Sequence, residues 1–234
     1  MSNILINYMK NRYRKDVPLT SNNRKRTGPV VTISREYGCP AKRIAEKLSI
    51  ALNQIEVQNY SKQSWQWISK EILDKSAKEL NLRTELIREV ANKEQDGLVE
   101  DIVMSLSHRE YPGDIKIKKT IREVIRSFAE QGHAIIVGRG GVSITRDMQY
   151  SLHIKIQAPL EWRINHVSKQ QMISLSEAKR KIQNIDLQRS LLREYYAGKK
   201  VGNDAFDVIY NYLTLDEEDI ISSIIRLLEC KDMV

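Results

Sequence analysis

The chain has 234 residues, of which 41% are hydrophobic and 29% charged, as is ordinary for a globular protein of one domain or one domain with a smaller insert. No run of about 18 apolar residues occurs, so the sequence predicts no membrane span, and the first ten residues lack the charge order of a secretory signal. We therefore expect a cytoplasmic protein. The two cysteines, Cys39 and Cys230, do not have the spacing of a disulfide framework or a zinc site.

The net charge of +8 is concentrated at the N-terminus. Residues 1–28 contain seven lysines and arginines against Asp16 alone, so six of the eight net positive charges lie there. We interpret 1–28 as a basic N-terminal extension and favour a solvated arm over a segment that binds nucleic acid, an acidic partner or a second subunit. An apolar run, Ile4 to Met9, indicates that part of it docks on the body or on a partner, so a monomer and a homodimer both stay open.

The first half of the remaining chain begins with a buried strand from Val30, a tight turn and a helix. Ile44, Leu48 and Leu52 recur at helical spacing and predict that this helix continues to about Asn53. Three further helices are predicted by apolar repeats at 65–80, at 86–104 and at 117–128, the last closed by Gly132 as its C-terminal cap. Trp65 falls on an apolar stripe and is assigned to the core, whereas Trp67 stays open as a stacking face.

The second half continues the alternation of strands and helices. A buried strand is predicted at 133–137, an alternating strand near a sheet edge or rim at 152–157, and a last strand at 207–212. Pro159 is expected at the first position of a helix, and capping boxes at 174–177 and 214–217 start a long helix and the last helix. Strands separated by helices predict an α/β fold with a mostly parallel sheet and a ligand at the carboxyl ends of its strands.

The turn after the first strand is a candidate phosphate site. A turn at the carboxyl end of a strand directs backbone N–H groups and the positive end of a helix dipole to one point. It departs from the Walker A pattern, because Gly38 is the only glycine, Ala41 stands in the place of the lysine, and Arg43 stands in the place of the metal-binding hydroxyl. Lys42 follows one place after the lysine position, so the basic charge is kept but shifted.

Residues 32–38, Thr-Ile-Ser-Arg-Glu-Tyr-Gly, resemble the turn of the cytidylate kinase-like family of P-loop proteins. Residues 134–141 are similar to that family's third strand, which ends in Gly-Arg-Gly, and 186–189 fall where monophosphate kinases place lid residues. The resemblance extends from 30 to about 228. It implies a P-loop NTPase-like three-layer α/β/α domain over 29–234, with a helical insert at about 61–107 and a lid region at about 172–203.

The resemblance and the phosphate chemistry together nominate the residues of the turn. Lys42 is the candidate catalytic contact to the donor phosphates. Gly38 and the N–H groups of Cys39, Ala41 and Lys42 are expected to form a cradle around these phosphates. Arg35 offers a planar fork for phosphate, and Glu36 is expected to hold Arg35 or Arg43 or to position a metal through water. The predicted nucleotide-binding and phosphate-binding set is Ser34, Arg35, Glu36, Tyr37, Gly38, Cys39, Ala41, Lys42 and Arg43.

By resemblance, Arg139 would bind the acceptor phosphate, with Gly138 and Gly140 on either side. Arg189 and Arg193 are one helical turn apart and are expected to converge on a phosphate when a lid closes, with Asp186 orienting Arg189. The segment 195–202 has the glycines and lysines of a mobile, phosphate-facing loop. No metal ligands are assigned.

Three functions remain open. The first is a nucleotide kinase that moves the γ-phosphoryl of ATP, with Mg²⁺, to a small phosphorylated acceptor such as CMP. The second is a degenerate P-loop protein that binds nucleotide as a sensor or regulator, which Ala41 and Arg43 in altered positions support. The third is an RNA-binding protein that acts through 1–28. For Cys39, a pKa lowered by the helix N-terminus and an inert small side chain are both considered.

Overall fold

The computed structural model describes residues 28–61, 63–69 and 115–234. The predicted extension at 1–28, except for Gly28, the predicted helix at 86–104 and most of the predicted insert lie outside these residues. The described elements are β1 (Val30–Arg35), α2 (Ala41–Gln58), β2 (Gln66–Ile68), α5 (Ile115–Gln131), β3 (Ala134–Val137), α6 (Gly141–Ile144), β4 (Ser151–Gln157), α7 (Leu160–Gln171), α8 (Leu175–Ala197), the 3₁₀ turn η1 (Asn203–Ala205), β5 (Val208–Asn211) and α9 (Glu217–Cys230).

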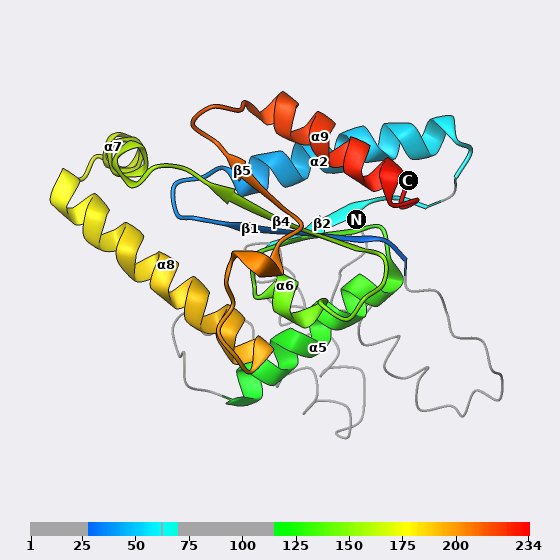
Figure 1. The fold of residues 1–234 in the computed structure, drawn as a ribbon, viewed down its shortest axis with the longest axis horizontal. Coiled ribbons are helices and arrows are strands. Elements are labelled where there is room, and N and C mark those ends of the chain that lie inside the picture. Colours follow the sequence, from blue (N-terminus) through cyan, green and yellow to red (C-terminus); the bar gives the residue numbers. More distant parts are fainter. Residues whose placement is uncertain (1–27, 62, 70–114) are drawn as a thin grey trace, which may run out of the picture.

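The five described strands form one parallel sheet in the order β2-β3-β1-β4-β5. Helices α2 and α9 cover one face of the sheet and α5 and α6 cover the other (Figure 1), which confirms the predicted three-layer α/β/α fold. β1 is the central strand, so the turn that follows it emerges in the middle of the carboxyl edge. The phosphate turn therefore lies where a doubly covered parallel sheet binds ligands.

The apolar stripe of α2 packs on the sheet as predicted. Ile44, Leu48 and Leu52 are fully buried against the apolar side chains of β1 and β4 and against α9. Burying an aliphatic side chain of this size contributes about 1.5–3 kcal/mol to folding, so this stripe anchors the helix that follows the phosphate turn. The helix continues to Gln58, beyond the predicted end.

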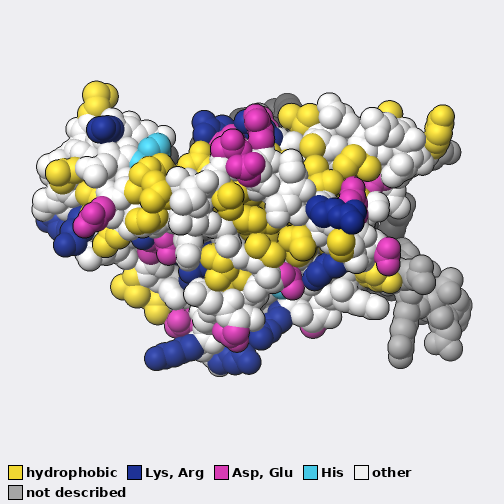
Figure 2. Space-filling model, turned by 45° about the horizontal axis from the view of Figure 1, so that its top comes forward, with side chains coloured by type: hydrophobic (Ala, Val, Ile, Leu, Met, Phe, Trp, Pro, Cys, Tyr) yellow, Lys and Arg dark blue, Asp and Glu magenta, His cyan; other side chains and the backbone are white. Residues whose placement is uncertain are grey.

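Charged side chains of both signs lie on the outer surface of the molecule. On the face drawn in Figure 2, the described basic and acidic side chains are interspersed among apolar and neutral ones. Among the described residues, no helix combines the length and the apolar character that a membrane span requires.

The strand β4 lies near an edge of the described sheet, as predicted, but it is covered on both sides by other strands. It lies between β1 and β5, and His153 is only 7% exposed. The alternation of polar residues arises instead because His153 has a polar partner across the sheet: its Nδ1 lies 2.8 Å from Oγ1 of Thr32, the residue paired with it in the register of β1 and β4. A buried polar side chain with a hydrogen-bond partner is tolerated inside a sheet.

Burial lowers the pKa of His153 to about 4, below its ordinary value. Between about pH 6.5 and pH 4 the unfolded chain then binds more protons than the folded one, so stability falls as the pH is lowered through this window. We expect His153 to account for about 2 kcal/mol of lost stability between pH 7 and pH 5. Urea unfolding at both pH values measures the change in the free energy of unfolding between them. This change should be smaller by about 2 kcal/mol in His153→Gln than in the wild type. An equal change in both proteins would contradict the role of His153.

The prediction of a helix starting at Trp65 is wrong for the residues that the structure describes. Residues 66–68 form the strand β2, which pairs with β3. Asn53 holds the backbone of Trp65 on both sides, since Trp65 N donates to its Oδ1 at 2.6 Å and its Nδ2 donates to Trp65 O at 3.0 Å. A short apolar run fits a strand and a helix equally well, and this tertiary anchor selects the strand. Trp65 is in the core as predicted, and Trp67 is half-buried at its margin.

The helix termini follow the sequence signals in part. Ser174 and Glu177 form the predicted capping box of α8, and Gly132 ends α5 with a φ of +79°. Pro159 is the N-cap of α7 rather than its first residue. The second predicted capping box is displaced: Asp216 is the N-cap of α9 and pairs with Asp219. Glu217, expected in that box, is instead bound by Arg43 and Lys47 of α2.

Candidate functional site

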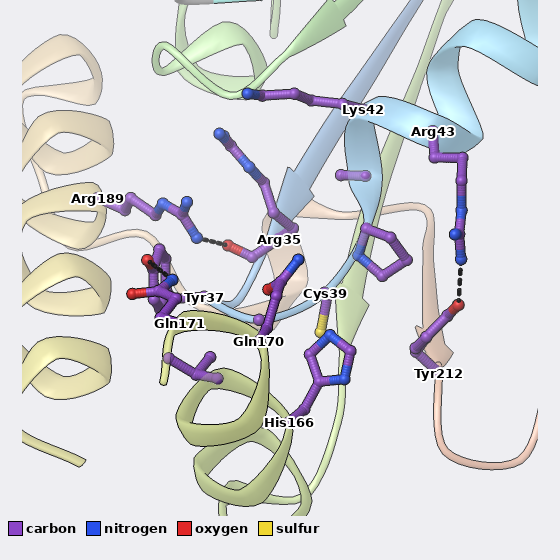
Figure 3. A pocket seen from close by; sticks show the side chains of 14 residues that line it. Arg35, Tyr37, Cys39, Lys42, Arg43, His166, Gln170, Gln171, Arg189 and Tyr212 are labelled. Atoms are coloured by element: carbon purple, nitrogen blue, oxygen red, sulfur yellow. Dashed lines mark hydrogen bonds between the residues drawn. The ribbon is translucent and has the colours of Figure 1, made fainter. Parts of the chain in front are cut away.

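Two adjoining cavities lie at the carboxyl edge of the sheet. The larger has a volume of about 600 Å³ (Figure 3). It is lined by Arg35, Tyr37, Gly38, Cys39, Pro40, Ala41, Lys42, Arg43, His166, Val167, Gln170, Gln171, Arg189 and Tyr212. The smaller has a volume of about 20 Å³ and is lined by Ser34, Arg35, Gly138, Arg139, Gly140, Arg189, Leu192 and Arg193. Most of the predicted site residues therefore come together, and Arg35 and Arg189 border both cavities.

The turn after β1 is closed by its own backbone and by one carboxylate. Cys39 N donates to Glu36 O at 3.2 Å, Ala41 N donates to Cys39 O at 3.0 Å, and Tyr37 N donates to Oδ1 of Asp186 at 2.7 Å. The amides of Cys39 and Ala41, predicted as part of a phosphate cradle, are thus already used. The loop has fewer glycines than a Walker loop and folds on itself, so side chains would contribute to anion binding here together with the remaining amides.

Asp186 is a clamp between the turn and two helices. Its Oδ2 accepts a hydrogen bond from Nη1 of Arg163 at 2.7 Å, whereas its Oδ1 lies 3.7 Å from Nη1 of Arg189. The prediction that Asp186 orients Arg189 therefore describes its weaker contact. Its principal partners are Arg163 and the backbone of Tyr37, which makes it a positioning residue for the turn.

Arg163 of α7 was not nominated by the sequence. It is 7% exposed, donates from Nε to Ala158 O at 3.0 Å and from Nη1 to Tyr37 O at 3.2 Å, and lies 3.3 Å from the carboxylate of Glu36. The prediction that Glu36 holds Arg35 or Arg43 is wrong, because Glu36 faces Arg163. The only sequence signal was the position of this arginine one turn before Val167 on the buried stripe of α7.

Arg189 and Arg193 of α8 border the small cavity. Nη1 of Arg189 donates to Arg35 O at 3.1 Å, and its guanidinium lies over the ring of Tyr37, 5.5 Å from the centroid. Burial lowers the pKa of both arginines from their ordinary value, because the charged form loses its hydration. The Nε of Arg193 is buried without a hydrogen-bond partner among the described residues. An anion in the cavity would compensate both charges.

The Gly-Arg-Gly segment has a left-handed backbone at three successive residues, with φ of +70° at Gly138, +54° at Arg139 and +69° at Gly140. A Cβ at Gly138 would overlap Nη1 of Arg35, and a Cβ at Gly140 would overlap the ring of Tyr196. Both glycines are therefore required by close neighbours. Arg139 adopts a conformation that costs a non-glycine residue about 1–3 kcal/mol, and such strain is concentrated at functional sites.

Lys42 and Arg43 start α2 but differ in their surroundings. Arg43 extends toward Tyr212, whose hydroxyl accepts from its Nη2 at 3.2 Å (Figure 3). The Nε of Arg43 contacts the carboxylate of Glu217. Lys42 extends to the opposite side, where Arg35 lies (Figure 3). Arg43 therefore closes one wall of the larger cavity through α9, and Lys42 lines the same cavity on the side of Arg35 (Figure 3).

Cys39 does not have the lowered pKa that the helix N-terminus suggested as one alternative. Burial raises the pKa of this thiol to about 12, and the carboxylates of Glu36 and Asp186 act in the same direction, against the guanidinium of Arg163. Desolvation of the thiolate exceeds the attraction of the nearby cation. Cys39 is thus an inert lining residue, and Cys39 and Cys230 are both free thiols.

The described residues contain no cluster of three or more histidine, cysteine, aspartate or glutamate side chains that would hold a metal ion. Glu36 and Asp186, the carboxylates of the turn region, both face Arg163. This part of the protein has no built Mg²⁺ site. The predicted phosphate-facing loop also differs from expectation: Lys199 and Lys200 are exposed after the cap Gly198 and line neither cavity.

One solved structure agrees with the fold. The crystal structure of an uncharacterized protein from Eubacterium ventriosum ATCC 27560 superposes with a TM-score of 0.55 and 19% identity, covering 86% of this chain and 98% of that one. Dephospho-CoA kinase from Campylobacter jejuni gives a TM-score of 0.39 with 13% identity, covering 88% and 98%. No curated protein sequence matches the chain. The family model of the cytidylate kinase-like family matches residues 30–211.

Proposed function

Because the chain belongs to the cytidylate kinase-like family, we propose that it is a phosphotransferase that moves the γ-phosphoryl of ATP to the phosphate of a small acceptor, a nucleoside monophosphate such as CMP. The two cavities support separate sites for the donor nucleotide and the acceptor phosphate. A cavity of about 600 Å³ is in the range of nucleotide and drug-sized ligands. The adjoining cavity of about 20 Å³ has room for about one water molecule, so an acceptor phosphate bound there requires the surrounding arginine side chains to shift outward.

The convergence of Arg35, Arg139, Arg189 and Arg193 on the small cavity is the observation that carries the proposal. No acidic residue is among the described residues that line either cavity. Asp186 lies 3.7 Å from Arg189 but does not line the cavity, so the described lining is net positive. A phosphate dianion reduces the repulsion among these guanidinium groups while accepting paired N–H bonds. The acceptor phosphate therefore belongs in the small cavity and the donor nucleotide in the larger one.

The reaction needs little from the protein besides positioning and positive charge. An oxygen of the acceptor phosphate attacks the γ-phosphorus; the bond from that phosphorus to the β,γ-bridging oxygen breaks, and ADP leaves. The acceptor reacts as its dianion, so no proton has to be removed. When bound, Mg²⁺ supplies charge neutralisation at the donor phosphates, and with no dedicated ligands among the described residues it would be held by phosphates and water.

The residues divide by cavity. Lys42 contacts the donor phosphates, with Tyr37, Gly38, Cys39, Ala41 and Arg43 as walls of the nucleotide cavity. Arg139, Arg189 and Arg193 bind the acceptor phosphate, with Ser34, Gly138 and Gly140 as the walls of its cavity. Asp186 and Glu36 act indirectly, by holding the turn against Arg163.

The test is ADP formation from ATP and Mg²⁺ across CMP, dCMP, UMP, AMP and GMP with the full chain. We expect turnover with one acceptor, and we expect Arg139→Met to raise the KM for that acceptor at least tenfold, since a charged hydrogen bond to phosphate is worth about 1.5–3 kcal/mol. Arg226→Met is the control, because Arg226 is an exposed residue of α9 paired with Glu229. Turnover that is insensitive to Arg139→Met would contradict the placement of the acceptor.

A second candidate function is a degenerate relative that binds nucleotide without transferring phosphate. The engagement of Arg43 with Glu217 and Tyr212 favours it, because the side chain in the place of the metal-binding hydroxyl is committed to a structural contact. This alternative predicts thermal stabilisation by ATP or ADP and no ADP formation with any acceptor in the panel. That pair of results would overturn the kinase proposal.

A further inference from the structure

Arg35 lies at the boundary between the two cavities. It is a lining residue of both, as is Arg189. The two arginines are connected, because Nη1 of Arg189 donates to the backbone oxygen of Arg35 at 3.1 Å. A group that passes from a donor in the larger cavity to an acceptor in the small one must cross this boundary.

The backbone of the turn has few donors left for that group. In a glycine-rich phosphate loop, successive amides surround the phosphates. Here the amides of Tyr37, Cys39 and Ala41 donate to Asp186 Oδ1, Glu36 O and Cys39 O. Position 40 is a proline, which has no amide hydrogen. Charge on the moving oxygens is therefore met by the remaining amides of the turn together with side chains.

The guanidinium of Arg35 has a defined place. Arg35 is the last residue of the central strand β1, and its register partner in β4 is Ile156. Its head lies against Gly138, where any Cβ would overlap Nη1. Figure 3 shows the side chain rising from the turn on the side of Lys42, with Arg189 beside its backbone. The absence of a side chain at Gly138 is therefore what makes room for this cation at the boundary.

We propose that Arg35 is a catalytic residue that binds the transferred phosphoryl group and bridges donor and acceptor, the part that the helix lysine has in a Walker loop. The inference rests on the proposed function and deepens it. A guanidinium presents parallel N–H donors that match two oxygens of a phosphoryl group. Charge spreads over those oxygens during transfer, so a fixed cation at this point stabilises the transition state more than the bound substrates.

The kinetic test compares Arg35→Met, Arg35→Lys and Lys42→Met with the Arg226→Met control, each checked for folding by thermal unfolding. We expect Arg35→Met to lower kcat about 100-fold or more, as loss of one preorganised donor does elsewhere, with the KM for ATP changed by less than about threefold. Arg35→Lys should recover only part of the loss, since it keeps the charge without the fork. A kcat within about threefold of the wild type, or a loss confined to KM, would overturn the proposal.

A binding test separates this inference from the proposed function. ADP with Mg²⁺ and fluoroaluminate, a planar mimic of the transferred group, should raise the wild-type Tm more than ADP and Mg²⁺ alone. In Arg35→Met we expect the ADP shift to remain and the added increment to disappear. Wild-type turnover together with an increment retained in Arg35→Met would overturn the role of Arg35 and leave the kinase intact. If the wild type shows the increment but no turnover, and Arg35→Met lacks the increment, the result would support the role of Arg35 and overturn the proposed kinase activity. Neither turnover nor increment in the wild type would overturn both.

Discussion

Replacing Arg163 by methionine is expected to lower the free energy of unfolding by about 3 kcal/mol and to reduce nucleotide binding. The side chain is buried and satisfies Ala158 O, Tyr37 O and the carboxylate of Asp186. Removing the arginine of a buried ion pair leaves its carboxylate partner without that compensating charge. This costs about 3–5 kcal/mol when both groups are fully buried, and less here because Asp186 is half-buried. Urea unfolding and ADP titration of the same variant measure the two effects.

The double variant Arg163→Met with Asp186→Asn provides the control for that experiment. An asparagine keeps the size of the side chain and an acceptor for Tyr37 N, but it removes the stranded charge. We expect it to regain about 1–2 kcal/mol relative to Arg163→Met alone, as coupled sites do in a double-mutant cycle. A cycle in which the two effects simply add would show that Arg163 acts by packing and not by holding Asp186.

Alanine at Gly140 is expected to destabilise the protein by at least about 2 kcal/mol more than alanine at Gly198. The two glycines have nearly the same φ, +69° and +67°, so both substitutions pay the same left-handed backbone cost of about 1 kcal/mol. Only at Gly140 does a new Cβ overlap a neighbour, the ring of Tyr196, while at Gly198 nothing lies within 4 Å. The difference between the two variants therefore isolates the contact between the Gly-Arg-Gly segment and α8.

The same pair tests how the small cavity is assembled. Tyr196 is buried, and its hydroxyl donates to Lys118 O at 3.0 Å, so displacing its ring shifts the helix that presents Arg193. We expect Gly140→Ala to raise the KM for the acceptor at least tenfold and Gly198→Ala to leave this KM near the wild-type value. Thermal unfolding and the acceptor KM measure both outcomes. Equal effects of the two substitutions would show that Tyr196 yields without cost and that α8 is not fixed by this contact.

The proposed site depends on guanidinium groups where a Walker loop depends on amides. The turn has one glycine, and the amides of Tyr37, Cys39 and Ala41 are bonded within the protein, so it offers fewer donors than a Walker loop. Arg35 comes from β1, Arg139 from the end of β3, and Arg189 and Arg193 from α8. Helix α8 packs on α6 and α7 and already brings its arginines to the cavity, so no closing of the predicted lid at 172–203 is needed to gather these charges.

Features that depend on neighbours along the chain could be predicted from the sequence. The stripe of Ile44 and Leu48, the box of Ser174 with Glu177, and the glycine cap of α5 are local signals, and each lies where it was predicted. The position of the phosphate turn after β1 and of Gly-Arg-Gly after β3 followed from the same alternation, because parallel strands end at one edge.

Which charged groups meet depends on the folded arrangement and could not be predicted from the sequence. Arg43 and Glu217 are 174 residues apart, and Tyr37 and Asp186 are 149 apart, so no pattern along the chain relates them. Burial likewise made His153 a neutral interior residue and raised the pKa of Cys39, in both cases because desolvation acts through atoms from distant segments. Periodicity records which face of an element is buried, whereas the partner of a charge depends on what the completed fold places across from it.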